Sequence, residues 1–111
     1  MDKLEKYRSY IKKIIKEYAQ LSSNNDLVEA QTIFDYENDH YQLVYVGWEN
    51  NIRTYGCVLH FDIKNDKIWI QYNGTEIDVA NELVKLGVPN HDIVLGFQDA
   101  YSRQFTEFSS A

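Results

Sequence analysis

The chain has 111 residues, of which 44% are hydrophobic and 25% charged, and this length supports one domain over residues 1–111 with one core. The single cysteine, Cys57, excludes an internal disulfide and therefore a disulfide-stapled secreted domain. No apolar run approaches the ~20 residues of a membrane span, and the N-terminus lacks the apolar run of a signal peptide. We therefore expect a cytoplasmic protein without membrane contact.

The formal net charge of −6 is spread unevenly along the chain. Residues 1–16 carry a net charge of +4, whereas residues 17–111 carry −10. An acidic body repels duplex DNA, whose binding needs several phosphate contacts, so we expect no direct sequence-specific DNA binding. The basic segment is interpreted as a solvated helix face, and a local route to nucleic acid stays open as the alternative.

Residues 3–21 have the apolar spacing of a helix that buries one face. Hydrophobic side chains recur every three or four positions at Leu4, Tyr7, Ile11, Ile14, Tyr18 and Leu21. We expect this helix to end at residues 22–25 and to pack on a sheet, with a helical partner as the alternative.

Residues 27–73 predict a four-stranded antiparallel meander. The expected strands are 27–35, 40–48, 52–63 and 67–72, and the turns between them are rich in Asn and Asp, which tolerate positive φ. Alternation in the third strand assigns Tyr55, Cys57, Leu59, Phe61 and Ile63 to a core face.

The opposite, second face of this sheet is expected to be half apolar, because it carries Val58 and Trp69 besides His60 and Asp62. Such a face on a small sheet indicates that a helix or a partner covers it.

The C-terminal third predicts a second helix and a packed tail. Thr75 is the expected N-cap, the helix runs to about Leu86, and Gly87 is the expected C-cap. Residues 92–97 form a short apolar strand or turn, and the aromatic tail, 98–111, should dock on the body. The fold class is therefore α+β: a helix, a four-stranded antiparallel meander, a second helix, a short apolar strand or turn and an aromatic tail.

Motifs for catalysis are missing from the sequence. There is no Gly-x-Ser-x-Gly elbow, no phosphate-binding glycine loop and no acid-x-Lys pair of the kind that nuclease strands favour. Cys57, on the expected core face, is interpreted as a small core residue. We assign no catalytic residue and no cofactor, and we expect a protein that is not an enzyme.

The histidines allow one metal-site hypothesis. His60 and Asp62 point to the same face of one strand, and His40 could lie on the neighbouring strand. The preferred interpretation is ordinary polar residues on a partly covered face, so no metal ligand is assigned.

An ordered set of short motifs spans nearly the whole chain. The set consists of FDYENDHYQL (34–43), VGW (46–48), YGC (55–57), HFDI (60–63), KIWIQ (67–71), NGTE (73–76), ANELV (80–84), GVP (87–89), DIVLGF (92–97), Arg103 and TEF (106–108). In this order and spacing the motifs resemble the XisI family, the fdxN-element excision controlling factors of cyanobacteria. The Tyr7-Arg8 pair in the first helix also fits this family.

The resemblance implies a control protein in programmed DNA rearrangement during heterocyst differentiation. It implies a companion, an XisH-like protein that looks like a nuclease fold, and a site-specific recombinase that performs the strand chemistry and is contacted only indirectly. No catalytic residue is established for the family, so none is transferred to this chain.

The leading hypothesis is a non-catalytic regulatory protein that binds an XisH-like partner. The residues expected at the partner contact are Trp48, His60, Asp62, Trp69 and Glu76. The structural alternative is that Trp48 and Trp69 only cap the core under the N-terminal helix. Alternative functions are an antitoxin-like neutraliser of a nuclease-like partner and a small-molecule binding protein or enzyme. A homo-oligomer is also plausible.

Overall fold

The computed structural model describes residues 2–21 and 27–111, so the expected helix stop at 22–25 lies outside the described residues. The elements are α1 (Lys3–Leu21), β1 (Val28–Asp35), β2 (His40–Glu49), β3 (Ile52–Lys64), β4 (Lys67–Asn73), α2 (Val79–Leu86), the 3-10 helix η1 (Asn90–Asp92), β5 (Ile93–Leu95) and α3 (Ala100–Arg103). The α+β fold class is confirmed.

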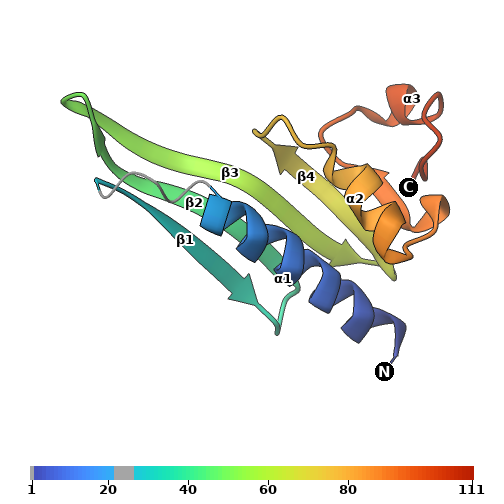
Figure 1. The fold of residues 1–111 in the computed structure, drawn as a ribbon. Helices are drawn as coiled ribbons and strands as arrows, with labels where there is room; N and C mark the ends of the chain where they lie inside the picture. The colour runs from blue at the N-terminus through green and yellow to red at the C-terminus, as the bar shows by residue number, and fades with distance from the viewer. Residues whose placement is uncertain (1, 22–26) are drawn as a thin grey trace.

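The five strands form one sheet in sequence order (Figure 1). The first four pair as an antiparallel meander, as expected, and β5 adds to the edge of β4 in the parallel direction. The apolar segment 92–97, expected to be a strand or a turn, therefore contains a strand. A single bridge between Val94 and Ser109 extends the sheet by one residue of the tail.

Two tight turns explain why the meander closes where it does. Asn50 and Asn51 between β2 and β3, and Asn65 and Asp66 between β3 and β4, all have positive φ. Two successive residues with positive φ give the hairpin turn whose twist matches that of the strands, and Asn and Asp adopt it at low cost.

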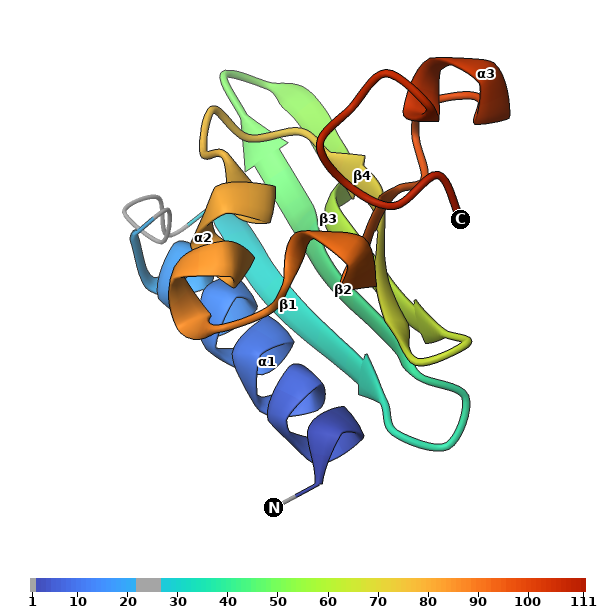
Figure 2. The ribbon, with the colours of Figure 1, turned by 90° about the vertical axis from the view of Figure 1, so that its right-hand side faces the viewer.

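Both longer helices lie on one side of the sheet, whereas α3 lies beyond β4, displaced toward the other side (Figure 2). The α1 stripe buries Tyr7, Ile11, Ile14 and Ile15 against the sheet, whereas Leu21 at its end is 71% exposed and does not join the core. The α1 helix therefore packs on the sheet, as the apolar spacing predicted.

A bulge in β3 overturns the predicted face of Cys57. Leu43 pairs with Leu59, but Val44 pairs with Cys57, so Val58 is an extra residue and the alternation reverses there. Cys57 is exposed on the second face, and Val58 instead packs against the core. The interpretation of Cys57 as a core residue is wrong, because strict alternation cannot anticipate an inserted residue.

The second helix begins later than predicted. Its N-cap is Asp78, whose carboxylate accepts a hydrogen bond from the backbone N–H of Asn81. Thr75 is not the cap, because it belongs to a turn in which its backbone N–H and hydroxyl both donate to the side chain of Asn73. Gly87 is the C-cap with a φ of 115°, as predicted.

The tail docks through only part of its aromatic set. Phe108 packs against the core, but Tyr101 and Phe105 are 71% and 73% exposed. Among the described residues, no helix combines the length and the hydrophobicity needed to cross a membrane.

Candidate functional site

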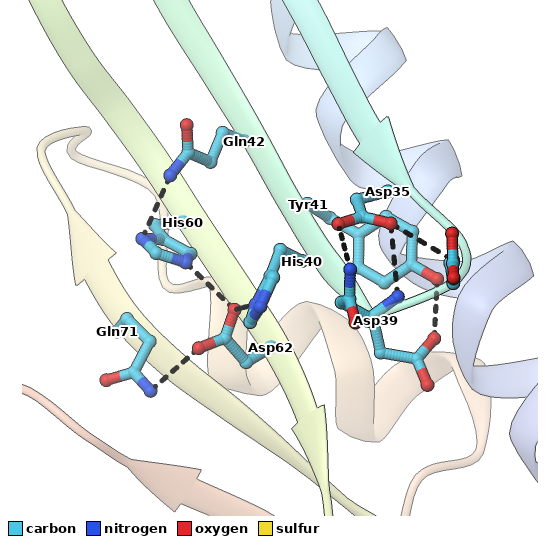
Figure 3. Close-up of polar contacts among 10 residues, drawn as sticks. Asp35, Asp39, His40, Tyr41, Gln42, His60, Asp62 and Gln71 are labelled. Carbon is cyan, nitrogen blue, oxygen red and sulfur yellow. Dashed lines mark hydrogen bonds and ion pairs between the residues drawn. The ribbon is translucent and has the colours of Figure 1, made fainter.

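A cluster of polar side chains lies on the second face, where β2, β3 and β4 run side by side (Figure 3). His40 and Asp62 are direct partners across β2 and β3, and His60 lies two residues before Asp62 on the same face. His40 Nδ1 and His60 Nε2 lie 2.8 and 2.9 Å from the same oxygen, Oδ1 of Asp62. The sequence-based expectation that these three residues share a face is confirmed.

Two amides complete the cluster. Gln71 donates from Nε2 to the second carboxylate oxygen of Asp62 at 3.0 Å, and the Nε2 of Gln42 lies 3.4 Å from His60 Nδ1. Gln71 follows Trp69 by two residues on the same face, and it is the extra residue of a second bulge, between the pairs His60–Tyr72 and Phe61–Ile70.

The electrostatics of the cluster favour an ionised Asp62. Burial alone raises the pKa of this carboxyl group, but the hydrogen bonds from His40, His60 and Gln71 outweigh burial and hold the pKa below its ordinary value. The hydrogen bond to Asp62 in turn raises the pKa of His40. The arrangement therefore concentrates one negative charge beneath two imidazole rings.

Beyond the cluster, the second face carries a large uncovered apolar surface. Ile33, Trp48, Tyr55 and Tyr72 are 45%, 54%, 73% and 50% exposed. We call the surface formed by Ile33, Val44, Val46, Trp48, Tyr55, Cys57 and Tyr72 the open face. No described helix lies over it, because α1 and α2 cover the other side of the sheet and α3 lies beyond β4 (Figure 2).

Trp69 lies next to the cluster but is not part of the open face. It pairs with Asp62 across β3 and β4, and its ring is flanked by Lys64 Nζ at 4.2 Å and by the Arg103 guanidinium at 5.2 Å. Its indole Nε1 is buried without a hydrogen-bond partner among the described residues. The tail therefore covers this tryptophan.

The predicted contact residues do not all come together. His60, Asp62 and Trp69 are neighbours, and Trp48 lies on the same face near the far end of β2. Glu76 is exposed on the helix side, where its charge acts on Tyr18 of α1. The alternative that Trp48 and Trp69 cap the core under the N-terminal helix is wrong, because both lie on the face opposite α1.

The basic residues of α1 are mostly engaged within the fold. Arg8 forms two hydrogen bonds to the carboxylate of Asp39, and Lys3 lies 2.9 Å from Asp92. Lys12 and Lys16 lie over aromatic rings of the β1 region. An open groove of about 560 Å³ runs beside this helix, lined by Glu5, Arg8, Ser9, Lys12, Lys13, Lys16 and Tyr36. Part of the positive charge thus attaches α1 to the sheet.

Sequence reasoning missed Gln42 and Gln71 as residues of the cluster. It assigned Tyr55 to the core face, which is wrong, because Tyr55 is 73% exposed and pairs with Val46 on the second face. Gln42 could have been found from the register, because it pairs with His60. Gln71 could also have been found, because it follows Trp69 by two residues and alternation puts both side chains on one face. Tyr55 could not, since it reaches the second face only through the bulge at Val58, which the alternation pattern does not reveal.

Comparisons with known proteins confirm the resemblance. The profile of the family described as "XisI protein" matches residues 1–110. A crystal structure of a XisI-like protein from Anabaena variabilis is similar at 48% identity with a TM-score of 0.92, over 97% of this chain and 99% of that one. No curated protein matches.

A second crystal structure, of the fdxN element excision controlling factor XisI from Anabaena variabilis, is similar at 39% identity with a TM-score of 0.86. The similarity covers 99% of this chain and 100% of that one. With a family match over nearly its full length and two such relatives, this chain belongs to the XisI family.

Proposed function

We propose that the protein is a non-catalytic regulatory protein that binds an XisH-like companion through the open face, and thereby controls site-specific DNA excision in the cytoplasm. The observation that carries the proposal is the open face itself. It presents four large side chains, each 45% or more exposed, on a sheet whose other side packs against α1 and α2. Contiguous exposed apolar surface of this kind is typical of a protein–protein interface.

The side chains of the open face suit binding rather than solvent exposure. Trp48 and Tyr55 are amphipathic aromatic side chains of the type that anchors interfaces. The Arg53 guanidinium lies 5.6 Å from the Trp48 ring and supplies a polar neighbour. We propose Trp48 as the anchor and His60 and Asp62 as the polar border of the contact. Trp69 and Glu76, which lie outside this surface, stay predictions.

The relatives support the regulatory part of the proposal. One similar structure is named a controlling factor for excision of the fdxN element. The resemblance assigns no catalytic residue, and the partner would contribute any nuclease chemistry. The recombinase is proposed to be affected only through this partner.

Coexpression with the protein encoded next to it, followed by affinity purification and light scattering, tests the proposal. We expect a stable hetero-complex of defined mass. Trp48→Ala should weaken it by about 2 kcal/mol, roughly 30-fold in Kd. Tyr101→Ala, which removes a 71% exposed aromatic ring from the tail, is the control for the 54% exposed Trp48 and should leave affinity unchanged.

Failure of the two proteins to co-purify contradicts the proposal, and so does equal weakening of the complex by Trp48→Ala and Tyr101→Ala.

The acidic body of the protein, with a net charge of −10 over residues 17–111, favours a second form of the proposal, in which the protein neutralises the companion by imitating DNA. Only neutralisation predicts that the companion is toxic when expressed alone and harmless when this protein is added.

A further inference from the structure

The His40, His60 and Asp62 cluster has the composition and shape of a metal site. Each residue offers one ligand atom, and these atoms all lie within 4.8 Å of one another. Two imidazole nitrogens converge on one carboxylate oxygen, so three potential ligand atoms lie close together on one face of the sheet (Figure 3).

The donor set suits a particular class of ion. Imidazole nitrogen with carboxylate oxygen is the chemistry that Zn²⁺ and its first-row neighbours accept, whereas Mg²⁺ and Ca²⁺ prefer oxygen ligands alone. We infer that His40 Nδ1, His60 Nε2 and the Asp62 carboxylate bind a divalent transition-metal ion, with Zn²⁺ the best match.

Only small movements bring the three atoms to ligand positions. Zn²⁺ holds nitrogen and oxygen ligands at about 2.0–2.2 Å, which in tetrahedral geometry sets them about 3.4 Å apart. The present separations from Asp62 Oδ1 are 2.8 and 2.9 Å, so these two pairs open by about 0.5 Å. The two imidazole nitrogens lie within 4.8 Å of each other and close by up to about 1.4 Å, and side-chain rotation accommodates both changes. The three backbones are already fixed by the β2–β3 ladder.

A second layer of side chains supports the ligands. Gln42 touches the far nitrogen of His60, and a half-turn of its amide presents an oxygen that accepts from Nδ1–H when Nε2 holds the metal. Gln71 holds the second oxygen of Asp62. Asp35, which pairs with His40 across β1 and β2, adds a negative charge to the surroundings of the ion.

The site is open on one side. The His40 side chain is 52% exposed and that of His60 27%, whereas that of Asp62 is only 10% exposed. An ion resting on the buried carboxylate therefore has its fourth position toward solvent, where water completes the tetrahedron. The inference concerns the isolated chain and is independent of the proposed partner.

Titration of the untagged, chelator-treated protein with Co²⁺ tests the inference, because tetrahedral Co²⁺ has intense visible absorption. We expect one ion per chain, displacement by Zn²⁺ and a rise in Tm with added Zn²⁺. His60→Gln and Asp62→Asn should abolish the tetrahedral signal. His91→Gln changes an exposed histidine outside the cluster and should retain it.

His40→Gln provides the variant that is safest for folding, because His40 is the most exposed ligand. It should weaken Zn²⁺ binding at least about tenfold while the circular dichroism spectrum stays that of the parent. The inference is wrong if the parent gives no tetrahedral Co²⁺ signal, or if His40→Gln and His60→Gln bind Co²⁺ and Zn²⁺ as the parent does. Equal response to Mg²⁺ and Zn²⁺ would also overturn it.

Discussion

Tyr7 of α1 donates a hydrogen bond to the carboxylate of Asp92, a buried residue 85 positions further along the chain. Lys3, one turn earlier, lies 2.9 Å from the same carboxylate. This link joins the first helix to η1, directly before β5. A buried carboxylate needs such partners, so the link helps fix where the two ends of the fold meet.

Replacing Tyr7 by Phe should destabilise the protein in a pH-dependent way. Burial alone raises the pKa of Asp92, but the hydrogen bonds from Tyr7 and Lys3 outweigh burial and hold the pKa below its ordinary value. The stabilisation is therefore complete at neutral pH and is lost as the pH falls through the folded-state pKa. Tyr7→Phe should lower the free energy of unfolding by about 1.5–3 kcal/mol at pH 7, and by less in acid.

Urea unfolding at a series of pH values measures this effect. Tyr36→Phe, which removes the hydroxyl of a 52% exposed ring, is the control and should change little at any pH. An identical pH dependence for Tyr7→Phe and the parent would show that the link does not stabilise the fold.

Gly47 should tolerate no side chain, in contrast to Gly56. A Cβ at Gly47 would lie 2.0 Å from the backbone oxygen of Leu27 and 2.7 Å from the Cα of Val28, whereas a Cβ at Gly56 meets nothing within 4 Å. Gly47→Ala must displace the start of β1 and should cost about 1–3 kcal/mol. Gly56→Ala should be neutral or stabilising by up to about 1 kcal/mol. Thermal unfolding of the two variants decides, and equal effects would contradict the close approach at Gly47.

Substitutions at two adjacent residues of α2, Leu83 and Val84, test which face of this helix packs on the core. Leu83 is fully buried against the core, whereas Val84 is 37% exposed. Leu83→Ala should cost about 2–5 kcal/mol, because it removes buried surface and leaves a cavity. Val84→Ala should cost well under 1 kcal/mol. Urea unfolding that ranks the two substitutions in the opposite order would mean that α2 is rotated about its axis.

Much of the fold could be predicted, because local patterns decide it. The apolar spacing of residues 3–21 predicts the buried face of α1, and the Asn-rich turns predict where the strands of the meander end. The boundaries of α1 match those expected. The face of Cys57 could not be predicted, because a single extra residue at Val58 reverses the alternation and depends on pairing with β2. The N-cap at Asp78 was not predicted, because the hydrogen bonds that Thr75 donates to the Asn73 side chain hold Thr75 in the preceding turn.

In the candidate site, too, local patterns predicted some features, whereas others depend on contacts far apart in the sequence. His60 and Asp62 share a face by alternation alone, and the register then brings His40 opposite Asp62. The cover over Trp69 could not be predicted, because Arg103 reaches it from the tail, far along the chain. Glu76 lies apart from the cluster because its turn leads to the helix side of the sheet, and its contact with a partner stays a prediction.

The alkylation rate of Cys57 tests most directly whether the open face binds the companion. Cys57 is the only cysteine of the chain and lies exposed on that face. Burial raises the pKa of its thiol, so the rates are compared at one alkaline pH. A Cys57→Ser, Tyr101→Cys variant carries the label on the tail instead and serves as the control. We predict that the companion slows alkylation of Cys57 and leaves that of the control unchanged. A complex in which Cys57 reacts as fast as in the free chain would contradict the account.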